Sequence, residues 1–115
     1  MKETKLGDFE EVIMILVGIL GEEQAYALKI SEEFKSQNGR SVSIGAVHST
    51  LSRLEDKGFL KSAMGNATAE RGGRRKRIYT ITGYGLQVLK DARDFKINLW
   101  QQYPSLALDN LNHNI

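Results

Sequence analysis

The hydrophobic pattern of the chain changes its period near residue 59, and this change most constrains the fold. Before it, apolar residues recur at steps of three and four, which is typical of amphipathic helices. Phe59 to Met64 and Arg77 to Thr82 instead have the composition of β-strands, and the second alternates β-branched and aromatic residues. The segment between them, Gly65 to Lys76, contains three glycines. We therefore predict a β-hairpin with a long loop, placed after a set of helices.

Three helices are predicted before the hairpin. Their expected bounds are Asp8 to Gly21, about Gln24 to Gln37, and Ile44 to Lys57, with a connector at Arg40 to Val42 that includes at most one short strand. Asp8 and Glu11 form a capping pair for the first helix, Ser43 caps the third, and Gly58 suits its left-handed end. The side chains expected to face the core in the second and third helices are Ala27, Leu28, Ile30, Phe34, Ile44, Val47, Leu51 and Leu54.

A fourth helix is predicted from about Gly83 to Tyr103, with Thr82 as its cap and Pro104 as its boundary. At 1.5 Å per residue it is about 31 Å long, which is long for so small a domain. Its apolar residues form two stripes: Val88, Ala92, Phe95, Leu99 and Tyr103 on one, and Leu86, Leu89, Ile97 and Trp100 on the other. Because packing against its own domain needs only one stripe, the second indicates a partner.

The order helix, helix, helix, strand, strand, helix predicts a mainly α fold with a small β-hairpin. It is the arrangement of a winged helix-turn-helix followed by a long C-terminal helix. We expect residues 1–82 to form the winged helix-turn-helix DNA-binding domain, and residues 83–115 to form a dimerisation helix and a tail. A chain of 115 residues has room for one such domain.

The composition excludes several classes of protein. The chain has no cysteine, so disulfide scaffolds, thiol catalysis and Cys-ligated zinc are excluded. His48 and His113 lie on unrelated elements, and adjacent acids such as Glu22 and Glu23 diverge along a helix, so we predict neither an enzyme nor a metal or cofactor site. The longest apolar run, residues 12–20, falls short of the roughly 20 residues that a membrane span needs. We expect a cytoplasmic protein with no membrane partner.

Positive charge is concentrated in the middle of the chain. Residues 1–33 contain three lysines and eight acidic residues, a net charge of −5, whereas residues 34–77 contain ten basic and three acidic residues, a net charge of +7. Five of these positive charges lie at the end of the hairpin loop, at Arg71, Arg74, Arg75, Lys76 and Arg77. Phosphate polyanions are the usual target of such a cluster, although a solvated loop has the same composition.

The third predicted helix has an outer face suited to the major groove of DNA. Opposite Val47 it presents Gly45, Ala46, Ser49, Ser52, Arg53 and Asp56. Small residues permit a close approach, Arg53 can read a base edge, and the helix start at Ser43 can receive a phosphate. An ordinary serine-rich surface helix is the alternative for this face alone. Together with the basic hairpin, the face favours binding of nucleic acid.

Two segments, Ser43 to Ser62 and Gly72 to Leu89, resemble the PadR family of bacterial transcriptional regulators. The positions that match the family's motifs are Gly45, Leu51, Leu54, Glu55, Gly58, Gly73, Arg74, Lys76, Tyr79, Thr82 and Gly85. The resemblance implies a regulator that binds double-stranded DNA as a homodimer built with the C-terminal helix. It predicts a palindromic operator, because two symmetric recognition helices enter successive major grooves. We expect a repressor.

The chain departs from the family at His48, where the family has a tyrosine that is implied to touch the DNA backbone. His48 could donate a hydrogen bond to a phosphate in its place. Some relatives sense aromatic compounds between subunits, which implies a small aromatic effector here. Phe95, Leu99 and Trp100 are the candidate residues for that effector or for the dimer interface, and plain interface packing is the alternative for Trp100. The alternative function is a winged-helix module that binds protein instead of DNA.

Overall fold

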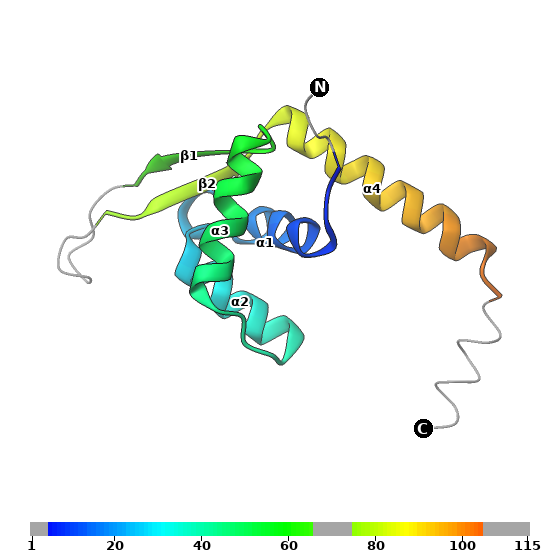
Figure 1. The fold of residues 1–115 in the computed structure, drawn as a ribbon, viewed down its shortest axis with the longest axis horizontal. Helices are drawn as coiled ribbons and strands as arrows, with labels where there is room; N and C mark the ends of the chain where they lie inside the picture. The colour runs from blue at the N-terminus through cyan, green and yellow to red at the C-terminus, as the bar shows by residue number, and fades with distance from the viewer. Residues whose placement is uncertain (1–4, 66–74, 105–115) are drawn as a thin grey trace.

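The computed structural model describes residues 5–65 and 75–104, and this part of the chain forms four helices and an antiparallel hairpin (Figure 1). In chain order the elements are α1 (Asp8–Gln24), α2 (Ala27–Asn38), α3 (Ile44–Asp56), β1 (Leu60–Met64), β2 (Arg77–Ile81) and α4 (Gly83–Gln102). The strand pairing runs from Leu60 opposite Ile81 to Met64 opposite Arg77. The predicted fold class, mainly helical with a small hairpin and a long C-terminal helix, is confirmed.

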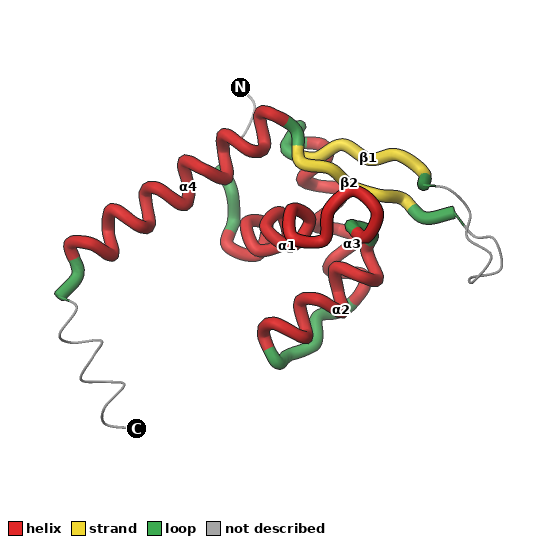
Figure 2. The backbone as a smooth tube through the Cα atoms, turned by 180° about the vertical axis from the view of Figure 1, so that it is seen from behind, coloured by secondary structure: helices red, strands yellow, loops and turns green. Residues whose placement is uncertain are grey.

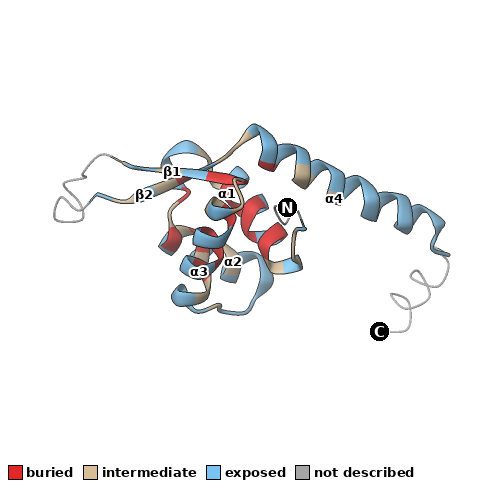
Figure 3. Cartoon of the chain, turned by 45° about the horizontal axis from the view of Figure 1, so that its top comes forward, coloured by how far each residue is buried: buried red, intermediate tan, exposed pale blue. Residues whose placement is uncertain are grey.

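The core lies between α1, α2, α3 and the base of the hairpin. The largest fully buried side chains come from all of these elements and from the turn after α3: Ile13, Met14, Ile30, Val47, Leu51, Leu54, Phe59 and Leu60. Buried segments therefore gather in the winged part of the molecule, whereas α4 is exposed over most of its length (Figure 3). This packing fixes the orientation of α3 relative to the hairpin.

The first turn of α1 differs from the predicted capping pair. The N-cap is Gly7, and its backbone N–H donates to Oε1 of Glu10 at 2.7 Å. Glu10 therefore closes the first turn, and the expected pairing of Asp8 with Glu11 is wrong. The helix was predicted to end at Gly21, and this is wrong. Gly21 kinks the helix, with φ of 79° and ψ of −169°, and helical backbone resumes after it. That positive φ favours glycine.

Two apolar residues that were expected in the core are exposed. Leu28 of α2 is 44% exposed and Ile44 of α3 is 43% exposed, whereas Val47 and Ile30 are buried as predicted. Leu28 lies two residues from the buried Ile30, about 200° around α2, so it faces away from the core, and Ile44 lies at the edge of the buried face of α3. The connector at residues 40–42 contains no strand.

The predicted caps of α3 and α4 are confirmed. The Ser43 side chain accepts a hydrogen bond from the N–H of Ala46 at 3.1 Å, and the Thr82 hydroxyl accepts one from Gly85 at 2.9 Å. Gly58, which follows α3, has the positive φ of 81° expected of a left-handed end. These caps fix where the recognition-type helix and the C-terminal helix begin.

Backbone hydrogen bonds join the hairpin to the helices. The N–H of Tyr79 in β2 donates to the carbonyl of Ala25 between α1 and α2 at 2.9 Å, and the N–H of Thr82 donates to the carbonyl of Phe59 at 3.1 Å. Strand β1 begins at Leu60, one residue later than predicted, because Phe59 is buried in the turn that follows α3. The base of the hairpin is therefore held against the helical core.

α4 diverges from the other helices after its first turns, as the views from both sides show (Figures 1 and 2). Gly85 is buried, Val88, Leu89 and Ala92 are half-buried, and the helix is exposed from Arg93 onward. In the exposed half, Lys96 forms an ion pair with Glu11 of α1. Both predicted apolar stripes of α4 are therefore largely uncovered by its own domain. The predicted tail, residues 105–115, lies outside the described residues.

Candidate nucleic-acid interface

The outer face of α3 carries small, accessible side chains. Gly45, Ser49 and Ser52 are exposed, and Ala46 is half-buried beside them. A Cβ added at Gly45 would have no heavy atom within 4 Å, so the surface is open at this point. A flat, small-residue face of this kind can approach the floor of a groove closely.

Arg53, the residue of α3 predicted to contact a base edge, forms hydrogen bonds within the protein. Its Nε donates to Oε2 of Glu10 at 3.0 Å, and its Nη2 donates to Oγ1 of Thr50 at 3.4 Å. The side chain nevertheless remains 51% exposed. The ion pair directs one edge of the guanidinium toward α1.

Glu10 is the carboxylate that ties α3 to the start of α1. Lys57 Nζ lies 3.0 Å from both of its oxygens, in addition to the contacts from Arg53 and Gly7. Burial raises the pKa of Glu10, but the hydrogen bonds from Gly7, Lys57 and Arg53 outweigh burial and hold the pKa below its ordinary value of 4.5. Glu10 therefore stays ionised at neutral pH and fixes the orientation of α3.

Three of the five predicted hairpin cations belong to the described residues, and Arg71 and Arg74 lie outside them. Arg75 donates through Nε to the carbonyl of Gly65 at 3.0 Å, and Arg77 donates through Nη1 to Oγ of Ser62 at 3.0 Å. Lys76 Nζ lies 4.5 Å from the ring centroid of Tyr26, a cation–π contact. These contacts leave the positive charges without a carboxylate partner among the salt bridges of the described chain.

A cleft brings the start of α3 and the start of β2 together. It has a volume of about 520 Å³. Its lining comes from α2, α3, β2 and the residues just before α2 and β2: Tyr26, Ala27, Leu28, Ile44, His48, Lys76, Arg77 and Tyr79. We call it the α3–β2 cleft. Burial raises the pKa of Tyr79, and the charge of Glu55 adds to this effect, so the phenol stays neutral. The predicted residues His48, Lys76 and Arg77 therefore share one concave surface.

Sequence reasoning did not select the other five residues of this cleft as site residues: Tyr26, Ala27, Leu28, Ile44 and Tyr79. Leu28 and Ile44 were assigned to the core because their spacing matches an apolar stripe. The helical phase could have indicated that Ile44 is partly exposed, because Ile44 lies 60° away from Val47 around α3, at the edge of the buried face. No signal in the sequence pairs Tyr26 with Lys76, because 50 positions separate them.

The candidate residues on α4 are all exposed. Phe95 is 64%, Leu99 is 49% and Trp100 is 59% exposed. Trp100 makes an edge-to-face contact with Tyr103, with ring centroids 5.5 Å apart. Large aromatic and aliphatic side chains at this exposure leave apolar area uncovered along the outer half of α4.

A three-helix core, an outward-facing third helix with small side chains and a cationic hairpin beside it define a winged helix-turn-helix protein. The model of the PadR-like family of transcriptional regulators matches residues 16–91. The chain belongs to this family, as the motifs around α3 and β2 predicted.

Solved structures of other proteins share this fold. A PadR-family regulator from Eggerthella lenta is 23% identical with a TM-score of 0.63, covering 84% of this chain and 80% of its own. A PadR-like regulator from Bacillus cereus is 22% identical with a TM-score of 0.61, covering 90% and 89%. Bacillus subtilis PadR, solved in complex with operator DNA, is 24% identical with a TM-score of 0.58, covering 73% of this chain and 45% of that protein.

A search of curated proteins gave no match. Within residues 5–65 and 75–104, none of the helices is long and apolar enough to span a bilayer. The same residues contain no group of three or more His, Cys, Asp or Glu side chains that could hold a metal ion.

Proposed function

We propose that this protein is a sequence-specific DNA-binding repressor that acts as a homodimer on a palindromic operator. The observation that carries the proposal is the α3–β2 cleft, because it sets the recognition face of α3 and the cations of the hairpin on adjoining surfaces. One duplex can then contact both elements, with α3 in the major groove and the hairpin at the neighbouring minor groove. A DNA-binding regulator works where the DNA is, so we place it in the cytoplasm.

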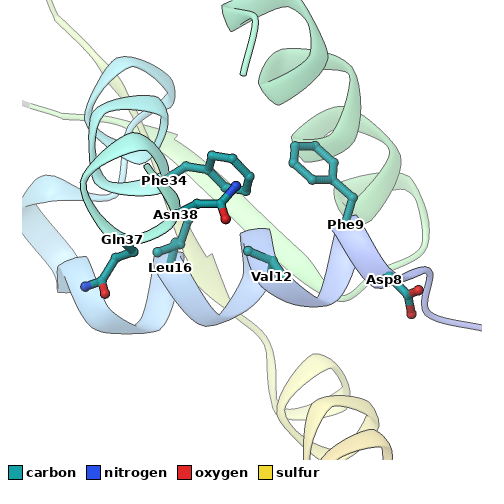
Figure 4. A pocket seen from close by; sticks show the side chains of 7 residues that line it. All are labelled: Asp8, Phe9, Val12, Leu16, Phe34, Gln37 and Asn38. Carbon is teal, nitrogen blue, oxygen red and sulfur yellow. The ribbon is translucent and has the colours of Figure 1, made fainter. Parts of the chain in front are cut away.

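The exposed apolar surfaces favour a second copy of the chain as the partner of α4. Besides the outer half of α4, helix α1 exposes Val12, Ile15 and Ile19 at helical spacing. Beside them lies a hollow of about 430 Å³ between α1 and α2, in which the rings of Phe9 and Phe34 meet edge to face (Figure 4). Covering these surfaces in a symmetric pair would also set the distance between two α3 helices.

Residues 83–115 act as the dimerisation segment in this proposal, and residues 1–82 act as the DNA-binding domain. A small aromatic effector would bind near Trp100 between the subunits and change the angle at which α4 leaves the domain. A ligand that prefers another angle shifts the spacing of the recognition helices and releases the DNA.

Selection of binding sites from random duplex DNA, followed by sedimentation of the selected complex, tests the proposal. We expect an inverted repeat whose half-sites lie one helical turn apart, about 34–36 Å, bound by two chains. A panel of aromatic compounds is then added, and we expect at least one to lower the affinity. Enrichment of no sequence contradicts DNA recognition, one bound chain per site contradicts the dimer, and equal affinity with every compound contradicts the effector.

A further inference from the structure

The α3–β2 cleft combines aliphatic surface with positive charge. Leu28 and Ile44 are 44% and 43% exposed, and both line this cleft. His48, Lys76 and Arg77 line the same cleft. This combination fits a ligand in which an anionic group is joined directly to an apolar body.

The position of the cleft indicates which ligand that is. In B-form DNA the major and minor grooves are separated by a sugar–phosphate backbone. A protein that places α3 in one groove and the hairpin in the next therefore straddles that backbone, and the cleft lies between these two elements. We propose that the cleft holds one deoxyribose-phosphate unit of the operator. This inference rests on the proposed function.

In this arrangement the phosphate lies beside Lys76, and Tyr26 is the positioning residue for that lysine. The ring of Tyr26 holds Nζ of Lys76 at 4.5 Å, within the range of a cation–π contact. Lys76 is part of none of the salt bridges found in the described chain, so its charge is available to an incoming anion. His48 can donate a hydrogen bond to the same phosphate.

The sugar lies against Leu28 and Ile44, which makes the subsite selective for deoxyribose. A 2′-hydroxyl at this position would lose its water, and neither aliphatic side chain offers a hydrogen bond in return. A deoxyribose has no such group to desolvate. The cleft therefore discriminates DNA from RNA at one nucleotide of each half-site.

Ribonucleotide scanning of the selected operator, with the full chain and a fluorescence anisotropy readout, tests this assignment. We expect one position in each half-site at which a ribonucleotide weakens binding about 10-fold. A 2′-fluoro nucleotide there, which favours the same sugar pucker as ribose but lacks the hydroxyl, weakens binding less. In the Leu28→Ala, Ile44→Ala double variant the 2′-hydroxyl regains water. The ratio of the affinity for the all-deoxy operator to the affinity for the ribonucleotide-substituted operator then falls below about twofold. Met64→Ala removes an apolar side chain of equal exposure, 44%, outside the cleft, and leaves the ratio unchanged.

Neutralising the phosphate tests the role of Tyr26. A methylphosphonate, which has no charge, replaces the phosphate next to the nucleotide at which ribose weakens binding. It weakens binding of the wild-type protein more than binding of Lys76→Met, because that variant has already lost the attraction between Lys76 and this phosphate. Tyr26→Leu behaves like Lys76→Met in this comparison, and Tyr26→Phe, which keeps the ring, behaves like the wild type. Equal effects in all four proteins overturn the positioning role.

The outcomes separate this inference from the proposed function. If the wild-type protein binds the operator but no position discriminates against ribose, the cleft assignment is wrong and the DNA-binding function stands. A ribose penalty that persists in the double variant also overturns the assignment. If the protein binds no duplex at all, the proposed function fails, and this inference fails with it.

Discussion

At Gly85 a single hydrogen atom in place of a side chain lets α4 cross the turn after α3. A Cβ added there would lie 2.0 Å from the carbonyl oxygen of Phe59 and 2.8 Å from its carbonyl carbon. That carbonyl cannot move freely, because it accepts hydrogen bonds from the backbone and the side chain of Thr82. We predict that Gly85→Ala lowers the free energy of unfolding by about 1–3 kcal/mol, measured by urea denaturation. Gly83→Ala is the control, since nothing lies within 4 Å of its Cβ, and equal losses in both variants would refute the steric argument.

Gly45 has the opposite character, because its surroundings are empty in the protein alone. With no heavy atom within 4 Å, Gly45→Ala and Gly45→Leu should leave stability unchanged or raise it by up to about 1 kcal/mol, since glycine is a poor helix former. In the proposed complex a leucine there would hold α3 away from the groove floor. We predict at least about a tenfold loss of operator affinity for Gly45→Leu, with a smaller loss for Gly45→Ala. Undiminished affinity in Gly45→Leu would exclude this face of α3 from the interface.

Between elements, Glu10 joins α1 to α3, and its depressed pKa makes that link sensitive to acid. A carboxyl group whose pKa is lower in the folded state stabilises the fold above its ordinary pKa, here 4.5, and loses this contribution as the pH falls through the folded pKa. We predict that Glu10→Gln costs about 1–3 kcal/mol at pH 7, with the share from the half-exposed Arg53 reduced by water.

Urea denaturation at pH 7, 5, 4 and 3 measures this contribution. The difference between wild type and Glu10→Gln should be constant from pH 7 to 5 and shrink below 4.5. Glu22→Gln, which changes an exposed carboxylate of the same helix, should show a small difference at every pH. A Glu10→Gln difference that does not depend on pH would mean that shape, not charge, joins the two helices.

At the level of elements, the sequence predicted what local chemistry determines. The side chains of Ser43 and Thr82 accept hydrogen bonds from N–H groups three residues further along the chain, and Gly58 adopts a positive φ that glycine favours. These interactions are local, so the helix boundaries that depend on them were predicted correctly. Leu28 and Ile44 were misplaced because apolar character was weighed above helical phase, which puts Leu28 opposite Ile30 and Ile44 at the edge of the buried face. The α3–β2 cleft and the Glu10–Arg53 pair depend on contacts between distant segments, and single-sequence patterns contain no record of them.

The whole molecule is more extended than a chain of its length needs to be. Its radius of gyration is 16.9 Å, against about 13 Å for a compact domain of this size. The excess follows from α4, which is exposed from Arg93 onward apart from the Lys96–Glu11 ion pair to α1. A protruding helix with apolar faces is costly in water for a monomer, which is why the proposed function pairs two chains through it.

Pairing has a consequence that the salt dependence of binding can measure, because each phosphate contact is made twice. If one protomer neutralises about four phosphates, the dimer neutralises about eight, and the slope of log affinity against log salt should be near −7. Arg75→Ala should reduce the magnitude of that slope by up to about 2, one contact in each protomer. Lys90→Ala, which removes an α4 cation paired with Asp94, should leave the slope unchanged. Anisotropy titrations from about 50 to 200 mM NaCl give these slopes. A reduction of about 1 for Arg75→Ala would instead mean that one hairpin of the pair touches DNA, and a flat response would exclude phosphate contacts altogether.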